Sequence, residues 1–411
     1  MAQSLWGRVY YKDIYTGLLQ QEPNGRCLFT YDPIYLSSES PQPISFLLPL
    51  RQEPYICEDG LHPFFDNLVS EGLLQGAQAR ALGISPRNHF ALLLGFGYDL
   101  AGAVSIIDPE PRPHVKIGSI DEVTDASLLN RASLSGVQQK LLVIKEGRNY
   151  RPTRANELST HIAKFPSGHL PDIVELEYLT TLGISKLLPE DSVVELEISS
   201  IASIRRPALI VKRFDRTASG KRIHFEEFNQ LLGNLPEAKY EGSYEEMGRF
   251  ICTKPSCLPV EADKLYKRIL ACLLIGNTDA HFKNFAMFHT RDGLRLTPAY
   301  DLVAAARYDI YHTIALKIDG VRDLSIGLLK SKHLVGMGSH FGLSENAIQD
   351  TVTEIGKRLP VAQTAISESD VGTKFLRDKL VDIMEKRWKG SFSSIGSLLS
   401  KRQSKGAKDK N

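Results

Sequence analysis

Cysteine and long apolar runs are scarce in this sequence, and neither sign of charge is in excess. Five cysteines occur in 411 residues, and no Cys or His pairs are spaced as in a zinc site. We therefore expect free or buried thiols, and neither a disulfide framework nor a structural metal site. Lys and Arg number 50 against 48 Asp and Glu, which leaves a net charge of +2. This balance gives no electrostatic argument for nucleic acid as the main ligand.

The most apolar long stretch, residues 89–107, contains His89, Asp99 and three glycines. It is too polar to span a bilayer. The first residues, MAQSLWGRVYYKD, contain no basic region followed by a long apolar run, which is the pattern of an export signal. We therefore expect a cytoplasmic protein that has no membrane partner.

A chain of 411 residues is too long for one compact core, so two or three domains are expected. Strand-like alternation and a helical repeat predict an N-terminal β/α accessory subdomain over residues 1–112. A strand-rich lobe with one helix follows over 113–216, and amphipathic helices dominate 217–395. The basic end, 396–411, is predicted to be disordered. The predicted fold class is α+β, with a β-rich lobe and an all-helical lobe.

A cluster of polar residues directly follows an apolar helix at residues 277–285, NTDAHFKNF. Asp279 and Asn284 lie in this loop, a predicted β-hairpin follows, and Asp301 comes next in LTPAYD. Protein kinases have this order, in which the first Asp orients the substrate hydroxyl and the Asn and second Asp hold Mg²⁺. Hard oxygen ligands suit Mg²⁺. The order predicts ATP- and Mg²⁺-dependent phosphoryl transfer by a bilobal, protein-kinase-like fold.

Other interpretations of this loop stay open. Each of these residues alone could be a turn residue that satisfies backbone groups. Asp279 and His281 could instead be metal ligands of a metal-dependent phosphohydrolase, with His289 or His312 completing the site. Within the kinase interpretation, we expect His281 to brace the loop beside the nucleotide.

A kinase also needs cations for the phosphates, upstream of this loop. Lys164, in HIAKFP, lies in a predicted strand, and the predicted helix after it carries Glu175 and Glu177. A strand lysine that contacts phosphates and pairs with a helix carboxylate is a feature of kinases. The sequence leaves the choice of glutamate open, and we prefer Glu177.

Two further segments fit the same plan. RASLSGVQQK, residues 131–140, is neither a Walker A loop nor a G-x-G-x-x-G loop, because Gly136 is its only glycine. It offers hydroxyls at Ser133 and Ser135 and a cation at Lys140, so we expect it to cover phosphates or to accept one. IVKRFDR lies where strands give way to helices, the place of a kinase hinge that presents backbone groups to adenine.

Together, the ordered segments SLSGVQQK, THIAKFP, VKRFDR, GNTDAHFKNF and LTPAYD resemble the HipA family of bacterial toxin serine/threonine kinases. PFFDNLVSEG and LLLGFGYDLAGAV are similar to the N-terminal subdomain of that family. The likeness covers roughly residues 5–310. NLVSEG departs from the Leu-Pro-Glu-Gly-like stretch that is usual there, and the basic tail is not a family requirement.

The resemblance implies roles for these positions. Asp279 resembles the catalytic Asp of the family, and Asn284 and Asp301 resemble its Mg²⁺ ligands. The implied nucleotide-binding positions are Lys140, Ser135, Gly136 and Val137 in the loop, Lys164 in the strand, the backbone of Lys212 and Phe214 at the hinge, Asp215 near the ribose, and His281.

The resemblance also implies regulation and partners. Ser133 matches the serine that such kinases autophosphorylate to displace the loop and switch the enzyme off, and Ser135 is a second candidate. A phosphate there would add about two negative charges beside the ATP phosphates. Relatives phosphorylate aminoacyl-tRNA synthetases, which inhibits translation and is linked to persistence. A DNA-binding helix-turn-helix antitoxin of HipB type restrains these kinases. DNA contact would then be indirect. An inactive kinase-like scaffold that binds such an antitoxin is the remaining alternative. The presence of Lys164, Asp279, Asn284 and Asp301 together argues against it.

Overall fold

The computed structural model describes residues 4–110, 121–129, 133, 138–202 and 204–408. The chain forms two compact units, and each combines two separate stretches of sequence. The first unit contains Met1–Ser167 and Glu195–Glu237, and the second contains Gly168–Val194 and Ala238–Asn411.

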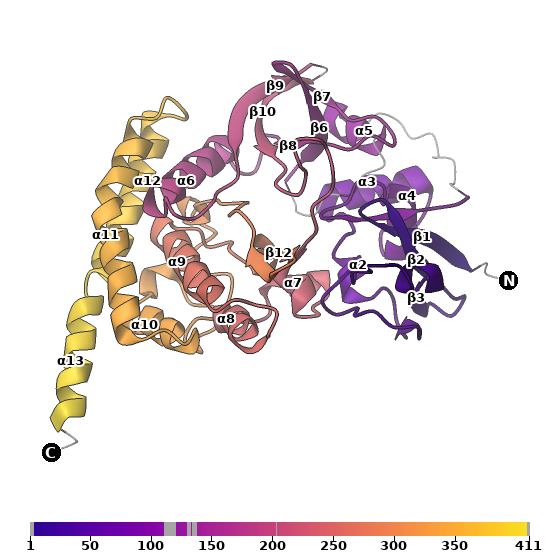
Figure 1. Cartoon of the computed structure of the whole chain (residues 1–411). Helices are drawn as coiled ribbons and strands as arrows, with labels where there is room; N and C mark the ends of the chain where they lie inside the picture. The colour runs from indigo at the N-terminus through magenta and orange to yellow at the C-terminus, as the bar shows by residue number, and fades with distance from the viewer. Residues whose placement is uncertain (1–3, 111–120, 130–132, 134–137, 203, 409–411) are drawn as a thin grey trace. The chain divides into compact units, whose positions relative to one another are not determined.

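An antiparallel five-stranded sheet forms the N-terminal part of the first unit (Figure 1). Alternating residues of its strands are buried, as Cys27, Phe29 and Tyr31 show, so one face of the sheet packs on the core. The strands are β1 (Leu5–Tyr11), β2 (Ile14–Gln21), β3 (Cys27–Tyr31), β4 (Tyr55–Cys57) and β5 (Val104–Ile107), in the order β4-β3-β2-β1-β5, and the helices are α1 (Pro33–Leu36), α2 (Pro63–Asp66), α3 (Gly72–Leu82) and α4 (His89–Phe96).

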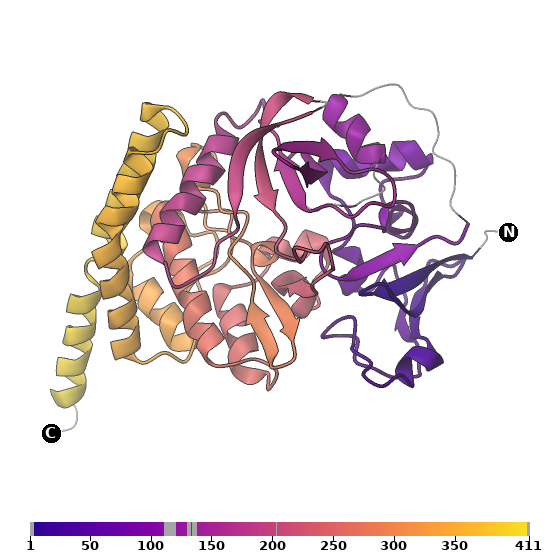
Figure 2. The ribbon, with the colours of Figure 1, turned by 45° about the horizontal axis from the view of Figure 1, so that its top comes forward.

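Five more strands of the first unit close into a small barrel (Figure 2). Two of these strands form a hairpin, with Gly147 at a φ of 62° in its turn, a conformation that glycine adopts without strain. Leu141, Ala163 and Phe165 belong to the buried core of the barrel. The elements are α5 (Glu122–Leu129), β6 (Lys140–Glu146), β7 (Asn149–Pro152), β8 (His161–Lys164), β9 (Leu196–Ile201) and β10 (Ile204–Lys212), followed by β11 (Phe225–Glu227) and α7 (Phe228–Leu231).

The second unit is mostly helical. Helices α6 (Ile173–Leu187) and α11 (Glu345–Ser367) are far apart in sequence but pack side by side (Figures 1 and 2). Helix α9 (Val260–Ile275) is buried on most of its surface. Among the described residues, no helix has the length and apolar character that crossing a membrane requires. The other elements are α8 (Tyr244–Thr253), β12 (Ala286–Thr290), β13 (Gly293–Leu296), α10 (Ser331–His340), α12 (Lys374–Arg387) and α13 (Ile395–Lys408).

The division of the chain in the structure differs from the predicted one in two respects. Helix α6, predicted within the strand-rich lobe of residues 113–216, packs on α9 and α11 and belongs to the second unit, whereas residues 217–237 belong to the first. The end of the chain was predicted to be disordered but forms α13. Although this helix is polar in composition, its few apolar residues lie at an amphipathic spacing, and Ile395 and Leu399 are buried.

Candidate active site

The predicted catalytic loop begins where α9 ends. Gly276 ends the helix with a φ of 87°, which is the usual left-handed termination by glycine. The side chain of Asn277 then turns the chain, because its Oδ1 accepts a hydrogen bond from the Asp279 amide at 3.1 Å. Asn277 is buried and Asp279 is exposed. The loop is therefore anchored inside the unit while Asp279 is presented at its surface.

Asn284 connects the two acidic residues that the sequence predicted as partners. Its Nδ2 donates hydrogen bonds to the backbone carbonyl oxygens of Asp279 at 3.2 Å and of Asp301 at 3.4 Å. The β12–β13 hairpin returns the chain so that these residues meet. Because Nδ2 faces the backbone, Oδ1 is the amide atom suited to ligate a cation.

Asp301 has a φ of 55°, in the left-handed region that residues other than glycine seldom adopt. Residues in such conformations cluster at functional sites, where neighbouring contacts hold them. Here Asn284 holds the Asp301 carbonyl, and the Ala304 amide donates to Thr180 Oγ1 at 3.1 Å. The carboxylate of Asp301 and the amide oxygen of Asn284 form a hard oxygen donor set, which fits Mg²⁺.

The rest of the loop is held by aromatic side chains. Tyr300 Oη donates to the Lys283 carbonyl at 2.7 Å. The Nδ1 atom of the buried His281 accepts a hydrogen bond from the Lys283 amide at 3.3 Å, and its ring lies edge-on to Tyr240 with centroids 4.8 Å apart. These contacts support the bracing role of His281, and its contact with a nucleotide stays a prediction.

Two predicted lysines face each other in the barrel of the first unit. Lys140 on β6 is the direct cross-strand partner of Lys164 on β8, so both side chains leave the same face of the sheet. Lys164 is only 5% exposed. A phosphate-binding role for this pair stays a prediction.

Ser133, the predicted phosphorylation site, is buried in the first unit. Its Oγ lies 2.8 Å from Oγ of Ser70, which belongs to the stretch NLVSEG that departs from the family pattern. Phosphorylation of Ser133 stays a prediction, and it would require this contact with Ser70 to break. The other loop residues that the sequence predicted, Ser135, Gly136 and Val137, lie outside the described residues.

The predicted hinge follows β10. The Lys212 amide donates to the Glu195 carbonyl at 2.9 Å, and the two side chains form an exposed ion pair at 2.7 Å. A hinge contact from Lys212 would therefore come from its carbonyl oxygen. The ring of Phe214 packs against Phe225 with centroids 5.0 Å apart. The predicted hinge contact of Phe214 with adenine would therefore come from its backbone.

Asp215, predicted near the ribose, lies in a buried ion cluster. Its Oδ2 is 2.6 Å from Arg213 Nη2 and 2.9 Å from Arg216 Nη1, and accepts a hydrogen bond from the Gly102 amide at 2.8 Å. Burial raises the pKa of Asp215, but the attraction of the two arginines is stronger, so the pKa is held well below its usual range. These contacts give Asp215 a structural role, and its contact with a ribose stays a prediction.

Glu175 and Glu177, the two candidates for pairing with Lys164, both lie on α6. Glu177 is buried and Glu175 is partly exposed. Because α6 and Lys164 belong to different compact units, the pairing and the choice of glutamate stay predictions.

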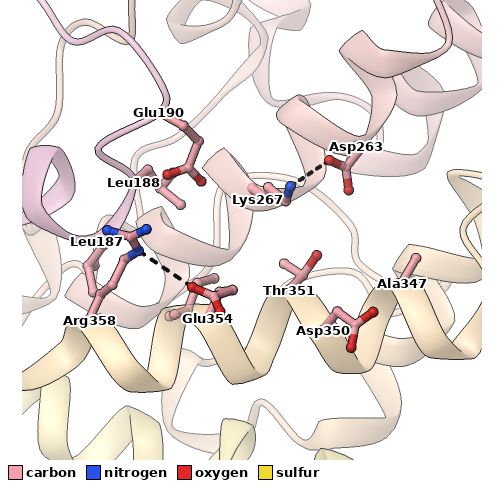
Figure 3. Close-up of a pocket in the computed structure, with 11 residues that line it drawn as sticks. Leu187, Leu188, Glu190, Asp263, Lys267, Ala347, Asp350, Thr351, Glu354 and Arg358 are labelled. Carbon is pink, nitrogen blue, oxygen red and sulfur yellow. Dashed lines mark ion pairs between the residues drawn. The ribbon is translucent and has the colours of Figure 1, made fainter.

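A groove of about 500 Å³ lies on the second unit, between the end of α6 and helices α9 and α11 (Figure 3). Lys267 pairs there with Asp263 at 2.7 Å, and Arg358 with Glu354 at 3.8 Å. None of the predicted site residues lines this groove. It is therefore distinct from the catalytic loop.

The phosphohydrolase interpretation gains no support from the geometry. Within the part of the chain that the structure describes, neither Asp279 nor His281 belongs to a group of three His, Cys, Asp or Glu side chains whose ligand atoms converge. The Nδ1 atom of His281 instead accepts the hydrogen bond from Lys283.

Two residues at these sites were missed by the sequence analysis. Tyr240 donates a hydrogen bond from Oη to Asp279 Oδ1 at 2.8 Å, and Ser70 contacts Ser133. Neither residue stands in a recognisable motif. The departure of NLVSEG from the family pattern was the one signal that pointed to Ser70.

Comparisons with known proteins agree on one family. Residues 7–107 match the HipA N-terminal domain family, and residues 132–363 match the HipA-like C-terminal domain family. The chain is 32% identical over 336 residues to the putative kinase Y4mE of Sinorhizobium fredii, which covers 74% of this chain and 78% of that protein. It is 29% identical over 334 residues to the serine/threonine-protein kinase toxin HipA of Shewanella oneidensis, covering 73% and 75%.

A solved structure has a similar fold. The Shewanella oneidensis complex of HipA, HipB and operator DNA contains a chain that matches with a TM-score of 0.76 and 23% identity, over 95% of this chain and 99% of that chain. The similarity confirms the predicted α+β, kinase-like fold.

Proposed function

The chain belongs to the HipA family of serine/threonine kinases, and from this premise we propose that Asp279, Asn284 and Asp301 carry out its phosphoryl transfer. The observation that supports this most strongly is the contact of Asn284 Nδ2 with the carbonyls of both aspartates. One side chain thereby fixes the backbone of all three residues. Such positioning is the main protein contribution to phosphoryl transfer.

Each residue has a separate task in the proposed reaction. ATP bound with Mg²⁺ would supply the transferable phosphoryl group and much of the charge neutralisation. Asp279 accepts a hydrogen bond from the acceptor hydroxyl, orients its oxygen and takes the proton. Asn284 and Asp301 would hold the Mg²⁺ through their side-chain oxygens, and Lys140 and Lys164 bind phosphate oxygens.

A labelling experiment tests this function. The phosphatase-treated chain, incubated with Mg²⁺ and ATP labelled in its γ-phosphate, is expected to label itself, with Ser133 as the main site and Ser135 as a second site. Removal of Mg²⁺ with EDTA is expected to lower the initial rate by at least about 100-fold, because a metal ion supplies several kcal/mol of charge stabilisation.

Scintillation counting gives the rate, and mass spectrometry gives the sites. A variant with both Ser133→Ala and Ser135→Ala is the control for site assignment. Label that persists in EDTA would contradict the metal role, and label that persists in the double variant would contradict the assigned serines.

The contact between Ser70 and Ser133 leads to a second prediction. Ser70→Ala is expected to speed the labelling of Ser133 about three- to tenfold, because a neutral hydrogen bond stabilises the buried position by roughly 0.5–1.5 kcal/mol. Ser37→Ala, at an exposed serine of the same subdomain, is the matched control and should leave the rate unchanged. An unchanged or slower rate in Ser70→Ala would refute the idea that this contact holds Ser133 back.

We further propose that this kinase is the toxin of a toxin–antitoxin system in the cytoplasm. Family membership supports this step, since one relative is a toxin kinase and the similar solved chain was found with HipB and operator DNA. The expected partner is a helix-turn-helix antitoxin of HipB type that makes the DNA contact. The expected substrate is a translation component such as an aminoacyl-tRNA synthetase. Phosphoproteome mapping after induced expression, with and without the antitoxin, tests both expectations.

A further inference from the structure

We propose that Tyr240 is a positioning residue that orients the carboxylate of Asp279 for phosphoryl transfer, an inference that rests on the function proposed above. Its phenolic Oη donates to Asp279 Oδ1 at 2.8 Å. Tyr240 precedes α8, 39 positions before Asp279 in the sequence, and both residues belong to the second unit.

The backbone and the side chain of Asp279 are held by different groups. Asn277 and Asn284 hold its amide and its carbonyl. Neither of these contacts reaches the carboxylate, which belongs to an exposed residue between buried neighbours and whose side-chain bonds allow rotation. The phenol of Tyr240 restricts that rotation. The donor on Oδ1 thereby sets the orientation in which the carboxylate meets the acceptor hydroxyl.

Tyr240 itself is held in place from two sides. Its ring lies edge-on to the buried His281, with centroids 4.8 Å apart, and Lys239 Nζ lies 5.6 Å from the centroid of the same ring. The side chain is nevertheless 46% exposed. A half-exposed phenol contributes little to the core, so its placement against a catalytic carboxylate is better explained by function than by packing.

The neighbouring Tyr244 shows what a purely structural contact looks like. It is fully buried, and its Oη donates to the backbone carbonyl of Ala280 at 3.1 Å. Tyr300 likewise donates to the backbone carbonyl of Lys283. Tyr240 differs from both because its hydrogen bond reaches the side chain that acts on the substrate.

The test compares Tyr240→Phe with Tyr300→Phe, since each variant removes one phenolic oxygen from the same loop. Initial rates of self-labelling by the phosphatase-treated full chain are measured over a range of ATP concentrations with Mg²⁺. Tyr240→Phe is expected to lower the maximal rate about tenfold, because hydrogen bonds to charged groups are stronger than neutral ones. The ATP concentration at half-maximal rate should stay within about twofold of the wild type.

Tyr300→Phe serves as the comparison for simple bracing of the loop and should lower the maximal rate less than about threefold. Thermal unfolding of both variants should match the wild type, which shows that each is folded. An equal loss in both variants would overturn the positioning role of Tyr240. An unchanged rate in Tyr240→Phe would overturn it too, and so would a raised rate, which would mean that the phenol competes with the acceptor hydroxyl. If the wild type transfers no label at all, the proposed function fails and the role of Tyr240 fails with it.

Discussion

Replacing Asp279 with asparagine is expected to lower the rate of phosphoryl transfer by about 10³-fold while leaving the chain folded and able to bind ATP. The loss follows from the role of the carboxylate as the group that orients the acceptor hydroxyl and takes its proton. An amide oxygen can still accept the hydrogen bond from Tyr240, but it cannot take a proton at neutral pH. The fold should survive because Asn277 and Asn284 hold the backbone of Asp279, not its side chain.

Self-labelling of the phosphatase-treated chain measures the rate, and isothermal titration calorimetry with ATP and Mg²⁺ measures binding. Asp292→Asn is a matched control, because Asp292 is an exposed residue in the turn of the nearby β12–β13 hairpin. It should retain the wild-type rate. Labelling by Asp279→Asn within about tenfold of the wild type would remove Asp279 from the catalytic role.

The proximity of Asp279, Asn284 and Asp301 was predictable from sequence because short-range features place these residues, while their catalytic roles stay predictions. A glycine ends α9, an Asx turn follows, and a tight hairpin separates Asn284 from Asp301. Each of these features has a sequence signature. The order of the polar residues therefore translated directly into their proximity.

Contacts between residues far apart in sequence could not be predicted in this way. Tyr240 meets Asp279 across 39 positions, and Ser70 meets Ser133 across 63. Such contacts depend on how helices and sheets pack, and no periodicity or turn motif encodes them. Nothing in the sequence marked Tyr240 as special, and only the departure of NLVSEG from the family pattern pointed to Ser70.

Asp215 illustrates a different limit. Its place after a predicted strand fitted a hinge. The structure instead buries Arg213 and Arg216 with Asp215 against Asp99, more than 110 positions earlier. Charged residues are seldom buried unless they are paired, and the sequence alone did not reveal the partner.

This buried ion cluster gives the prediction with the largest expected effect on stability. Asp99 Oδ1 accepts hydrogen bonds from Arg216 Nη2 at 2.6 Å and Arg213 Nη1 at 3.2 Å. Its Oδ2 accepts from the amide and the hydroxyl of Ser159 at 2.9 and 2.8 Å. Burial raises the pKa of Asp99, but the attraction of the arginines outweighs it and the pKa is lowered. The carboxylate is therefore ionised at neutral pH.

Asp99→Asn should destabilise the first unit by about 3–5 kcal/mol, because it removes one charge from a buried ion cluster. The amide nitrogen of the new side chain would also point its N–H groups at the arginine or serine donors that now bind the carboxylate, and two donors cannot form a hydrogen bond with each other. The two tryptophans make the measurement specific, since Trp6 lies in the first unit and Trp388 in the second. With Trp388→Phe as background, the fluorescence of Trp6 reports urea unfolding of the first unit alone.

Glu195→Gln is the matched control for this experiment. It makes the same change from carboxylate to amide in the same unit, but Glu195 forms an exposed pair with Lys212, and such pairs contribute less than about 1 kcal/mol. A loss in Asp99→Asn no larger than that of Glu195→Gln would contradict the structural role of the cluster. A loss of the expected size would mean that Asp99, in the N-terminal subdomain, stabilises the segment that the sequence assigned to the hinge. Two of its arginine partners, Arg213 and Arg216, lie shortly after β10.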